Sequence, residues 1–428
     1  MSYTFQAMSQ ATRPSVFRDP VHGLIDFQGC DAAIGRLLDT RAVQRLRSIR
    51  QLGFASLVYP GAEHSRFGHA LGTYHVASRV AARLGLEAEI ARDLKTAALL
   101  HDVGHGPFSH AWETALAGPG HEEWGRRIVR EDEELRGALL AVSAELPSAL
   151  DRLFGNSYRP RFVNKLICSQ LDADRMDYLL RDAYYTGVGY STYDLDWVIY
   201  ALRRLVVRPE DDDSEDLVVD HRRGLYALEQ YLFGRFHMYA QVYYHKTVRA
   251  AERLFLAIMR RFAELARQGS APPGLPAAAK IARGEALEVR EYLELDDARV
   301  SCALRDYAVW KGDRTLADLA ERLCSRRLFK TIEVADVAVA TALAPALAEL
   351  AARQFGSTAA YYWAIDEADW LGYDLRAGEE IYVVGHPRHG TVDLGQLLKE
   401  MPIGRTTLTV RIICAPELLA PFRALVGA

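Results

Sequence analysis

The sequence has few cysteines and no long apolar stretch. Its five cysteines lie at scattered positions: Cys30, Cys168, Cys302, Cys324 and Cys414. They are odd in number and form no CxxC pair, which argues against a disulfide framework or a cysteine-based zinc site. No run of about 18 apolar residues occurs, so we expect no membrane span. The N-terminal residues MSYTFQAMSQATRPS lack the apolar segment of a signal peptide, which makes a cytoplasmic location the default expectation.

An excess of charge of one sign is also missing. The chain carries 52 basic and 56 acidic residues, a net charge of −4, which gives no general attraction to nucleic acid or membrane. A local basic pocket stays open, because net charge averages over the whole surface. Half of the 428 residues are hydrophobic and a quarter are charged, as in soluble globular proteins. This length predicts one large catalytic body and at least one smaller lobe.

Turn and breaker residues divide the chain. Residues 1–14 are predicted to be a flexible tail, and VFRDPVHGLIDF (16–27) to be a β-hairpin around Pro20 and Gly23. Helical spacing dominates from about residue 31 to 265, and two LVV runs (205–207 and 217–219) predict a second hairpin within it. We therefore expect a helical core over residues 15–266.

A Pro- and Gly-rich segment follows the predicted core. RQGSAPPGLPAAAK (267–280) is predicted to be a linker or long loop. Helical patterns return after it, and EIYVVGH (380–386) and TLTVRIIC (407–414) are typical of strands. The predicted fold is mainly α: a helical core with small β-hairpins, and a smaller C-terminal α+β lobe over 281–428.

Histidines and aspartates are concentrated in a few segments. Six of the 13 histidines lie between residues 64 and 110, and the segment TAALLHDVGHGPFSH (96–110) is central. Its apolar run, residues 97–100, predicts a buried helix that ends in His101-Asp102. An imidazole beside a carboxylate at such a place is costly unless it is paired or bound to a metal. Gly104, Gly106 and Pro107 then end the helix and leave room for a substrate.

Other segments can complete a metal site. HSRFGHALG (64–72) supplies His69, and QLDADRMDYLLRD (170–182) supplies Asp174. Mixed imidazole and carboxylate ligands suit Zn, Fe, Mn, Ni or Co better than Ca. A single His-Asp dipeptide is common, and a histidine on an apolar helix is often a satisfied core residue. The ordered combination HDxGHGPxSH, upstream RFxH and downstream DxDRxDYLLRD favours the metal site.

These motifs are similar to those of the HD-domain superfamily, and specifically of its dNTP triphosphohydrolase branch. That branch includes bacterial dNTPases and the animal dNTPase that carries a SAM and an HD domain; too few residues precede the first hairpin here for a SAM domain. The resemblance covers roughly residues 15–330. The motifs that carry it are DPVHG (19–23), QRLRSIRQLG (44–53), YPGAEHSRFGHALG (59–72), HDVGHGPFSH (101–110), DADRMDYLLRD (172–182) and RFHMYAQVYYHK (235–246).

The resemblance implies roles for individual positions. The implied metal ligands are His69, His101, Asp102 and Asp174. The implied catalytic residues are His105, His110 and His121, with Glu113 orienting a catalytic histidine. The implied substrate contacts are Gln51, Leu52, Arg66, Arg175, Tyr178, Asp182, Arg235 and Tyr243.

The residue types suit triphosphate hydrolysis. A divalent metal, with Mg²⁺ able to accompany the triphosphate, polarises a phosphoryl oxygen. Arginines bind phosphates, and a histidine protonates the leaving oxygen. Tyr178 against C2′ would exclude a ribose hydroxyl. Simpler interpretations remain open: Tyr178 as a core residue, Arg66 and Arg175 as surface ion pairs, and Arg235 as a packing residue.

Regulation is suggested by resemblance alone. Asp39 and Arg47 match a guanine-reading pair in an activator site, and Arg326 and Lys330 match basic contacts to activator nucleotides. Ser15 and Arg18 depart from the family pattern, which puts the activator site in doubt. A homo-oligomer, dimer or tetramer, is expected, with the C-terminal lobe regulatory or oligomerising.

Three functions fit the sequence. The leading prediction is a dNTP triphosphohydrolase that forms a deoxynucleoside and triphosphate. A second interpretation keeps the metal site but changes the substrate, to a nucleoside monophosphate or a cyclic or linear dinucleotide, because a fold does not fix its substrate. A third is a nucleotide-sensing or nucleic-acid-binding protein whose site no longer turns over.

Overall fold

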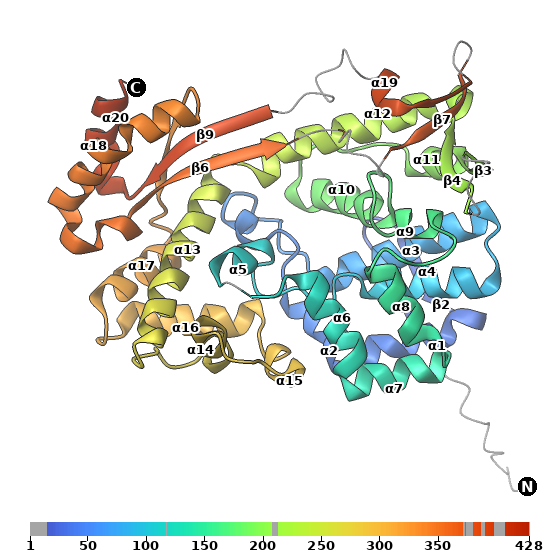
Figure 1. Ribbon diagram of the computed structural model, residues 1–428, viewed down its shortest axis with the longest axis horizontal. Helices are drawn as coiled ribbons and strands as arrows, with labels where there is room; N and C mark the ends of the chain where they lie inside the picture. The colour runs from blue at the N-terminus through green and yellow to red at the C-terminus, as the bar shows by residue number, and fades with distance from the viewer. Residues whose placement is uncertain are drawn as a thin grey trace, which may run out of the picture.

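The computed structural model describes residues 15–116, 118–207, 213–370, 373, 380–386, 390–397 and 407–427. The predicted flexible tail, 1–14, lies outside these residues. Helices dominate and the sheets are small, which confirms the predicted mainly α fold (Figure 1).

The helices are α1 (Ala32–Gly35), α2 (Arg41–Arg45), α3 (Arg66–Leu84), α4 (Ala88–Leu100), α5 (His110–Ala115), α6 (His121–Glu131), α7 (Glu133–Val142), α8 (Leu146–Phe154), α9 (Phe162–Lys165), α10 (Ala173–Thr186), α11 (Leu195–Ala201), α12 (His221–Met238), α13 (Lys246–Arg267), α14 (Pro276–Arg283), α15 (Val289–Tyr292), α16 (Asp297–Val309), α17 (Arg314–Cys324), α18 (Val337–Phe355), α19 (Leu394–Leu397) and α20 (Pro416–Val426). Short 3₁₀ segments are η1 (Gly29–Asp31), η2 (Arg36–Asp39), η3 (Leu46–Ser48), η4 (Gly53–Leu57) and η6 (Gly356–Tyr361), and η5 (Tyr239–Tyr243) is a π-helical turn. The strands are β1 (Ser15–Asp19), β2 (Gly23–Phe27), β3 (Leu202–Val206), β4 (Glu215–Asp220), β5 (Lys330–Val334), β6 (Trp363–Trp370), β7 (Tyr382–His386), β8 (Gly390–Asp393) and β9 (Thr407–Cys414).

The hairpin predicted at 16–27 is confirmed as the antiparallel pair β1–β2. Its turn is closed by the Asp19 carboxylate, which accepts hydrogen bonds from the backbone N–H groups of Val21 and His22, each at 2.9 Å. Gly23 adopts φ +78, a conformation that residues with a side chain rarely take. The turn therefore presents Asp19 and His22 toward the helices behind it.

Helices α3, α4 and α10 form the centre of the helical body. Both α4 and α10 pack against α3, and the facing residues are buried. The approach of α10 to α3 is very close at Gly72, where an added Cβ would lie 1.8 Å from Oδ1 of Asp177. Glycine is thus required at this position, and its absence of a side chain lets the polar face of α10 reach the inner face of α3.

The long amphipathic helix α13 connects the predicted core to the predicted lobe. It packs against α5 on one side and against α14, α17 and β5 on the other. The predicted linker at 267–280 needs correction, because α14 begins at Pro276. Proline suits the first turn of a helix, and the alanines after it favour helix continuation. Only residues 268–275 form the connecting loop.

The sheets also join the two predicted parts. β3 and β4 form the predicted second hairpin, and β7 then pairs in parallel with β4 and antiparallel with β8. Strands β7 and β8 therefore extend a sheet that begins in the core. The other sheet, β5–β9–β6, is antiparallel, and α18 and α20 lie beside it in Figure 1. The division into a core (15–266) and a lobe (281–428) stays a prediction, and one hydrophobic cluster spans both parts.

None of the helices in the described part of the chain combines the length and the apolar character needed to cross a membrane.

Candidate metal centre and active site

Three of the predicted ligands converge on one point. Nε2 of His69 lies 3.2 Å from Nε2 of His101 and 2.9 Å from Oδ1 of Asp174, and the last two atoms are 3.5 Å apart. Donor atoms about 3 Å apart are expected when each lies about 2 Å from a shared ion. Asp102, the fourth predicted ligand, approaches both imidazoles, with 3.3 Å from Oδ1 to His101 and 3.7 Å from Oδ2 to His69.

The other ring nitrogen of each histidine is held by an acceptor. Nδ1 of His101 donates to the backbone carbonyl of Ala98 at 2.8 Å, and Nδ1 of His69 donates to Oδ2 of Asp177 at 2.7 Å. These bonds place the proton on Nδ1 and direct the Nε2 lone pair toward the shared point. The two rings are therefore in the tautomer that a metal requires, and the residues fit a divalent transition metal.

Asp177 is the centre of a buried network behind His69. It accepts two hydrogen bonds from the guanidinium of Arg181, each at 2.9 Å, and one from His22 at 2.6 Å. Arg181 also donates to Asp19 of the first hairpin at 2.8 Å. Although burial alone would raise it, the Arg181 charge holds the pKa of Asp177 well below its usual range. Asp177 is therefore an anion that orients His69 and increases its basicity.

The carboxylates also act on the pKa values of the two imidazoles. Burial lowers the pKa of His69, but hydrogen bonds with Asp174 and Asp177 outweigh it and raise the pKa to about 10. Burial also lowers the pKa of His101, but the Asp102 and Asp174 carboxylates outweigh burial and raise it. This strongly negative surrounding stabilises a positive charge at the Nε2 atoms, whether a proton or a metal ion carries it.

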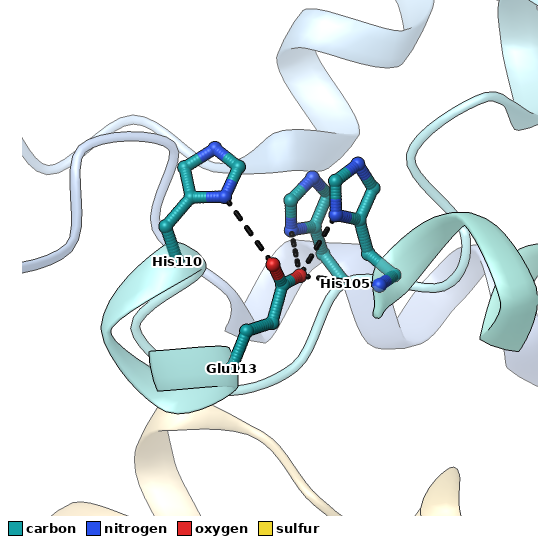
Figure 2. A group of neighbouring side chains, drawn as sticks. His105, His110 and Glu113 are labelled. Carbon is teal, nitrogen blue, oxygen red and sulfur yellow. Dashed lines mark hydrogen bonds and ion pairs between the residues drawn. The ribbon is translucent and has the colours of Figure 1, made fainter. Parts of the chain in front are cut away.

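Four further residues form a second cluster beside the metal centre. Oε1 of Glu113 lies 2.8 Å from Nδ1 of His121 and 3.7 Å from Nδ1 of His105, and Oε2 lies 3.5 Å from Nδ1 of His110. Figure 2 shows the Glu113 carboxylate pointing at the imidazoles of His105 and His110. The rings of His105 and His121 stack at 3.9 Å. Nε2 of His105 also lies 3.3 Å from Asp102, which links the two clusters.

The second cluster contains groups of different protonation. Burial and the nearby Arg66 charge lower the pKa of His105 well below its ordinary value, so this ring is neutral. Burial alone would raise the pKa of Glu113, but hydrogen bonds with His110 and His121 hold it far below its ordinary value. His110 is 74% exposed at its side chain, whereas His105 is buried. The cluster thus offers an anion, a neutral imidazole and imidazoles that can reach solvent.

Close backbone packing brings His121 to this place. Gly104 follows the His101-Asp102 pair, and an added Cβ there would lie 2.0 Å from the backbone oxygen of His121. Helix α6, which starts at His121, can therefore pack directly on the loop after α4. Glu113 on α5 and His121 on α6 can meet because Gly104 has no side chain to keep α6 away from this loop.

The loop between α4 and α5 is strained and anchored from the C-terminal part of the chain. Phe108 and Ser109 both have positive φ, at 54° and 56°. Asp297, the first residue of α16, accepts hydrogen bonds from the backbone N–H groups of Phe108 (2.7 Å) and Arg50 (3.0 Å). Ser109 accepts from Nε of Arg66 at 3.0 Å, and Arg66 also donates to Asp102. Such strain persists only where surrounding contacts over-determine it.

A cavity of about 680 Å³ opens onto both clusters. Of the predicted residues it is lined by Gln51, Leu52, Arg66, His101, Asp102, His105, His110, His121, Asp174, Arg175, Tyr178, Asp182 and Tyr243. This volume lies in the range of small-molecule and cofactor sites. His69 and Glu113 do not line the cavity themselves, but they contact residues that do, such as His101, Asp174 and His121.

The side of the cavity away from the histidines is built on α10. Asp182 accepts from Nε2 of His64 at 2.8 Å and from the Tyr243 hydroxyl at 2.8 Å, so both of its oxygens are engaged. The Tyr178 ring lies 6.3 Å from that of His69 and 6.2 Å from that of Tyr243. Arg175 pairs with Asp172, the residue that caps α10. Tyr178 is therefore a wall of the cavity immediately beside the metal centre.

Five predicted residues are not brought to the cavity. Arg235 is buried behind Tyr239, 5.8 Å from that ring, and donates to Gln170 at 3.4 Å. Asp39, Arg47, Arg326 and Lys330 are exposed on the surface. Arg47 lies 3.6 Å over the Phe67 ring, and Arg326 donates to the carbonyl of Leu57. The predicted roles of these residues in binding nucleotides stay predictions.

Sequence reasoning did not assign the supporting residues Asp177, Arg181, Asp19 and Asp297. The sequence does contain a signal for Asp177, because this residue follows Asp174 by three positions and so lies on the same face of the helix. Asp297 gave no such signal, since it lies 189 residues from its partner Phe108.

Comparison with known proteins agrees with this geometry. A family model described as "HD domain" matches residues 66–182, which include all four predicted ligands. An uncharacterized Bacillus subtilis protein, YwfO, is 36% identical over 373 residues, covering 85% of this chain and 82% of that protein. The Dictyostelium discoideum protein named deoxynucleoside triphosphate triphosphohydrolase SAMHD1 homolog is 29% identical over 256 residues, 55% of this chain and 47% of that protein. A crystal structure of a phosphohydrolase from Bacteroides thetaiotaomicron superposes with TM-score 0.78 at 28% identity, covering 94% of this chain and all of that one.

Proposed function

Because this chain belongs to the HD-domain superfamily of metal-dependent phosphohydrolases, we propose that it hydrolyses a deoxynucleoside triphosphate to the deoxynucleoside and triphosphate. Relatives named as dNTP triphosphohydrolases support this substrate class. The observation that carries the proposal is one cavity that both histidine clusters line, together with two arginines and the polar side chains of Gln51, Asp182 and Tyr243.

His69, His101, Asp174 and Asp102 would hold the metal. When bound, the ion supplies a Lewis acid that stabilises negative charge on a phosphoryl group. Arg66 and Arg175 lie on the same cavity wall as these ligands, where their guanidinium groups bind phosphate oxygens. Magnesium is compatible as a second ion that accompanies the triphosphate.

The second cluster handles protons. A water oxygen forms a bond to the α-phosphorus and releases a proton to solvent, and the bond from that phosphorus to the 5′ oxygen breaks. Nδ1 of His121 is engaged by Glu113, which leaves Nε2 to carry the proton that the leaving 5′ oxygen takes up. His105 stacks on His121 and fixes its plane. His110 is the exposed member and exchanges protons with solvent.

The sugar is held by residues of α10 and η5. Tyr178 packs against the C2′ face and leaves no space for a ribose hydroxyl. Asp182, Tyr243 and Gln51 supply polar groups for the 3′ side of the sugar.

The test is product analysis of metal-analysed protein with the four dNTPs, singly and mixed, and with the four rNTPs. We expect deoxynucleoside and triphosphate from dNTPs and much slower turnover of rNTPs. Activity that appears only in mixtures would indicate an activator nucleotide. Turnover of monophosphates or dinucleotides in place of dNTPs would favour the second interpretation, and binding without any turnover would favour a nucleotide sensor.

A further inference from the structure

The cavity also has a charged end on α13, where Arg249 and Glu252 line it. Asp174, Tyr178 and Asp182 follow one another along α10, and Asp182 accepts a hydrogen bond from the Tyr243 hydroxyl at 2.8 Å. The Arg249 guanidinium lies 5.8 Å over the ring of the next residue, Tyr244, and Tyr244, Arg249 and Glu252 all line the same cavity. Eight residues of helix separate Asp174 from Asp182, about 12 Å. A nucleotide with its α-phosphate at the metal and its sugar at Asp182 would therefore direct its base toward Arg249 and Glu252.

Arg249 is fixed from the C-terminal sheet. Its Nε and Nη2 donate to Asp366 of β6 at 3.1 and 2.6 Å, and its Nη1 donates to Glu252 at 2.7 Å. The Asp366 carboxylate is fully buried and is also held by Arg253 at 2.7 Å. Arg411 of β9 donates to the backbone carbonyl of Tyr244 at 3.0 Å. The three-stranded sheet thus positions both the polar end and the aromatic wall of the cavity.

Glu252 keeps one oxygen without a protein partner among the described residues. Its Oε2 accepts from Arg249, and no hydrogen bond is made to its Oε1. A similar triad lies three turns further along α13: Arg261 donates to Asp313 at 3.1 and 2.6 Å and to Glu264 at 3.2 Å. Glu264, however, is saturated, because Tyr361 and Arg260 also contact it, and it does not line the cavity. Of these two glutamates, it is therefore Glu252, at the cavity end, that has a carboxylate oxygen left to accept a hydrogen bond.

Apolar walls lead to this end. Leu52, Ala55 and Val248 pack together in one cluster and all three line the cavity, with the Tyr244 side chain nearby. Such walls suit a planar ring, and the charged end would then meet the edge of that ring. Burial raises the pKa of Glu252, and the nearby Arg249 charge opposes this effect only in part.

We propose that Glu252 and Arg249 form the base-recognition end of the cavity and select guanine. The proposal rests on the proposed function, since it takes the orientation of the nucleotide from it. Guanine presents two adjacent N–H donors, N1–H and N2–H, to a carboxylate, and O6 to a guanidinium. Adenine and cytosine offer an amino donor beside an acceptor, and thymine offers one N–H between two carbonyl oxygens. Guanine is therefore the base whose donors face the Glu252 carboxylate while its carbonyl oxygen faces the Arg249 guanidinium.

The test compares wild type with Glu252→Gln and with the matched control Glu264→Gln. Equilibrium binding is measured for deoxyguanosine, deoxyadenosine, deoxycytidine and thymidine, and kcat/KM for the four dNTPs. We expect wild type to prefer guanine in both assays. Glu252→Gln should weaken guanine binding and turnover by roughly 10- to 100-fold, the effect of one charged hydrogen bond, and change the other bases by less than about threefold. Glu264→Gln should leave all values unchanged.

The outcomes separate this inference from the proposed reaction. Hydrolysis of dNTPs without guanine preference, or an equal effect of Glu252→Gln on all four bases, would overturn the base site and leave the reaction standing. Deoxyguanosine binding that depends on Glu252, without hydrolysis of any dNTP, would support the base site and overturn the reaction. Because glutamine is isosteric with glutamate, the unaffected bases also report that the variant is folded.

Discussion

Two histidine and carboxylate clusters lie side by side in the cavity, and they are built differently. In the metal centre (His69, His101, Asp102 and Asp174) the His69 and His101 side chains are at most 11% exposed, and both Nδ1 atoms are engaged by acceptors. In the second cluster (His105, His110, Glu113 and His121) one carboxylate serves three imidazoles, and exposure ranges from 3% at His105 to 74% at His110.

The difference separates two kinds of chemistry. Metal ligands need a fixed tautomer with every lone pair pointing to one place, which requires a carboxylate or carbonyl behind each ring. A proton carrier needs a partner on one nitrogen and access to substrate or solvent on the other. His121, with Glu113 on Nδ1, satisfies the second description, and His69, with Asp177 on Nδ1, satisfies the first.

The largest effect is expected from His101→Ala. The substitution removes one of the three donor atoms that converge within 4.8 Å of one another. We expect metal content by elemental analysis to fall and hydrolysis of dNTPs to drop below detection. His237→Ala, at an exposed histidine outside both clusters, is the control. Full activity in metal-free His101→Ala protein would refute the metal centre.

Glu113→Gln should impair the second cluster and leave the metal centre unchanged. His121 loses its anionic partner, so we expect kcat to fall roughly 10²- to 10³-fold, the size of a lost proton-transfer contribution. Metal content should stay at the wild-type level. Glu123→Gln, whose carboxylate makes a surface pair with Arg130 at 3.4 Å, is the matched control. A parallel loss of metal would show that the two clusters act as one site.

Asp177→Asn tests the support behind the metal centre. The amide keeps the shape but removes the charge that orients His69, and we expect metal affinity to fall roughly 10- to 100-fold. The measurement is metal titration of the apo-protein, with Asp196→Asn as a control for loss of an exposed carboxylate paired with Arg79. Unchanged affinity would mean that the Asp177 network serves folding alone.

The smallest effect concerns stability and pH. His75 stacks on His22 at 5.2 Å, and burial together with the His22 and Arg79 charges lowers its pKa to about 4, against smaller opposing effects of Asp177 and Asp19. Between pH 6.5 and 4 the unfolded chain therefore binds a proton that the folded chain does not, and the free energy of unfolding falls as the pH falls. In His75→Gln this fall should be shallower.

Urea unfolding at several pH values measures the effect, with exposed His237→Gln as the control. Identical pH slopes in wild type and His75→Gln would show that His75 does not contribute to the acid sensitivity of the network.

Much of the fold followed from local pattern. The first hairpin, the helices around His101 and Asp174, and the strand at 407–414 were predicted because side-chain periodicity and turn residues act over a few positions. The linker at 267–280 was wrong over its second half, since Pro276 was interpreted as a breaker when it begins α14. The pairing of β7 with β4 joins residues about 160 positions apart, which no local pattern encodes.

The residues of the site also divide into those that local sequence predicts and those that it does not. His101 and Asp102 stand out in the sequence because a charged group at the end of an apolar helix demands a partner. His69 and Asp174 were predicted from the ordered motifs around them and from their resemblance to the family. Asp297 and Asp366 did not stand out, because their roles depend on partners that are distant in sequence.

Helix α13 shows most directly what each level decides. Arg249-Ala-Ala-Glu252 and Arg261-Phe-Ala-Glu264 are nearly the same local motif, and by itself the sequence determines that each forms an i,i+3 ion pair on a helix. Only the tertiary structure decides that Glu252 meets the cavity while Glu264 is saturated by Arg260, Arg261 and Tyr361. The physical reason is distance: the two pairs lie about 18 Å apart along the helix, so different elements pack against them.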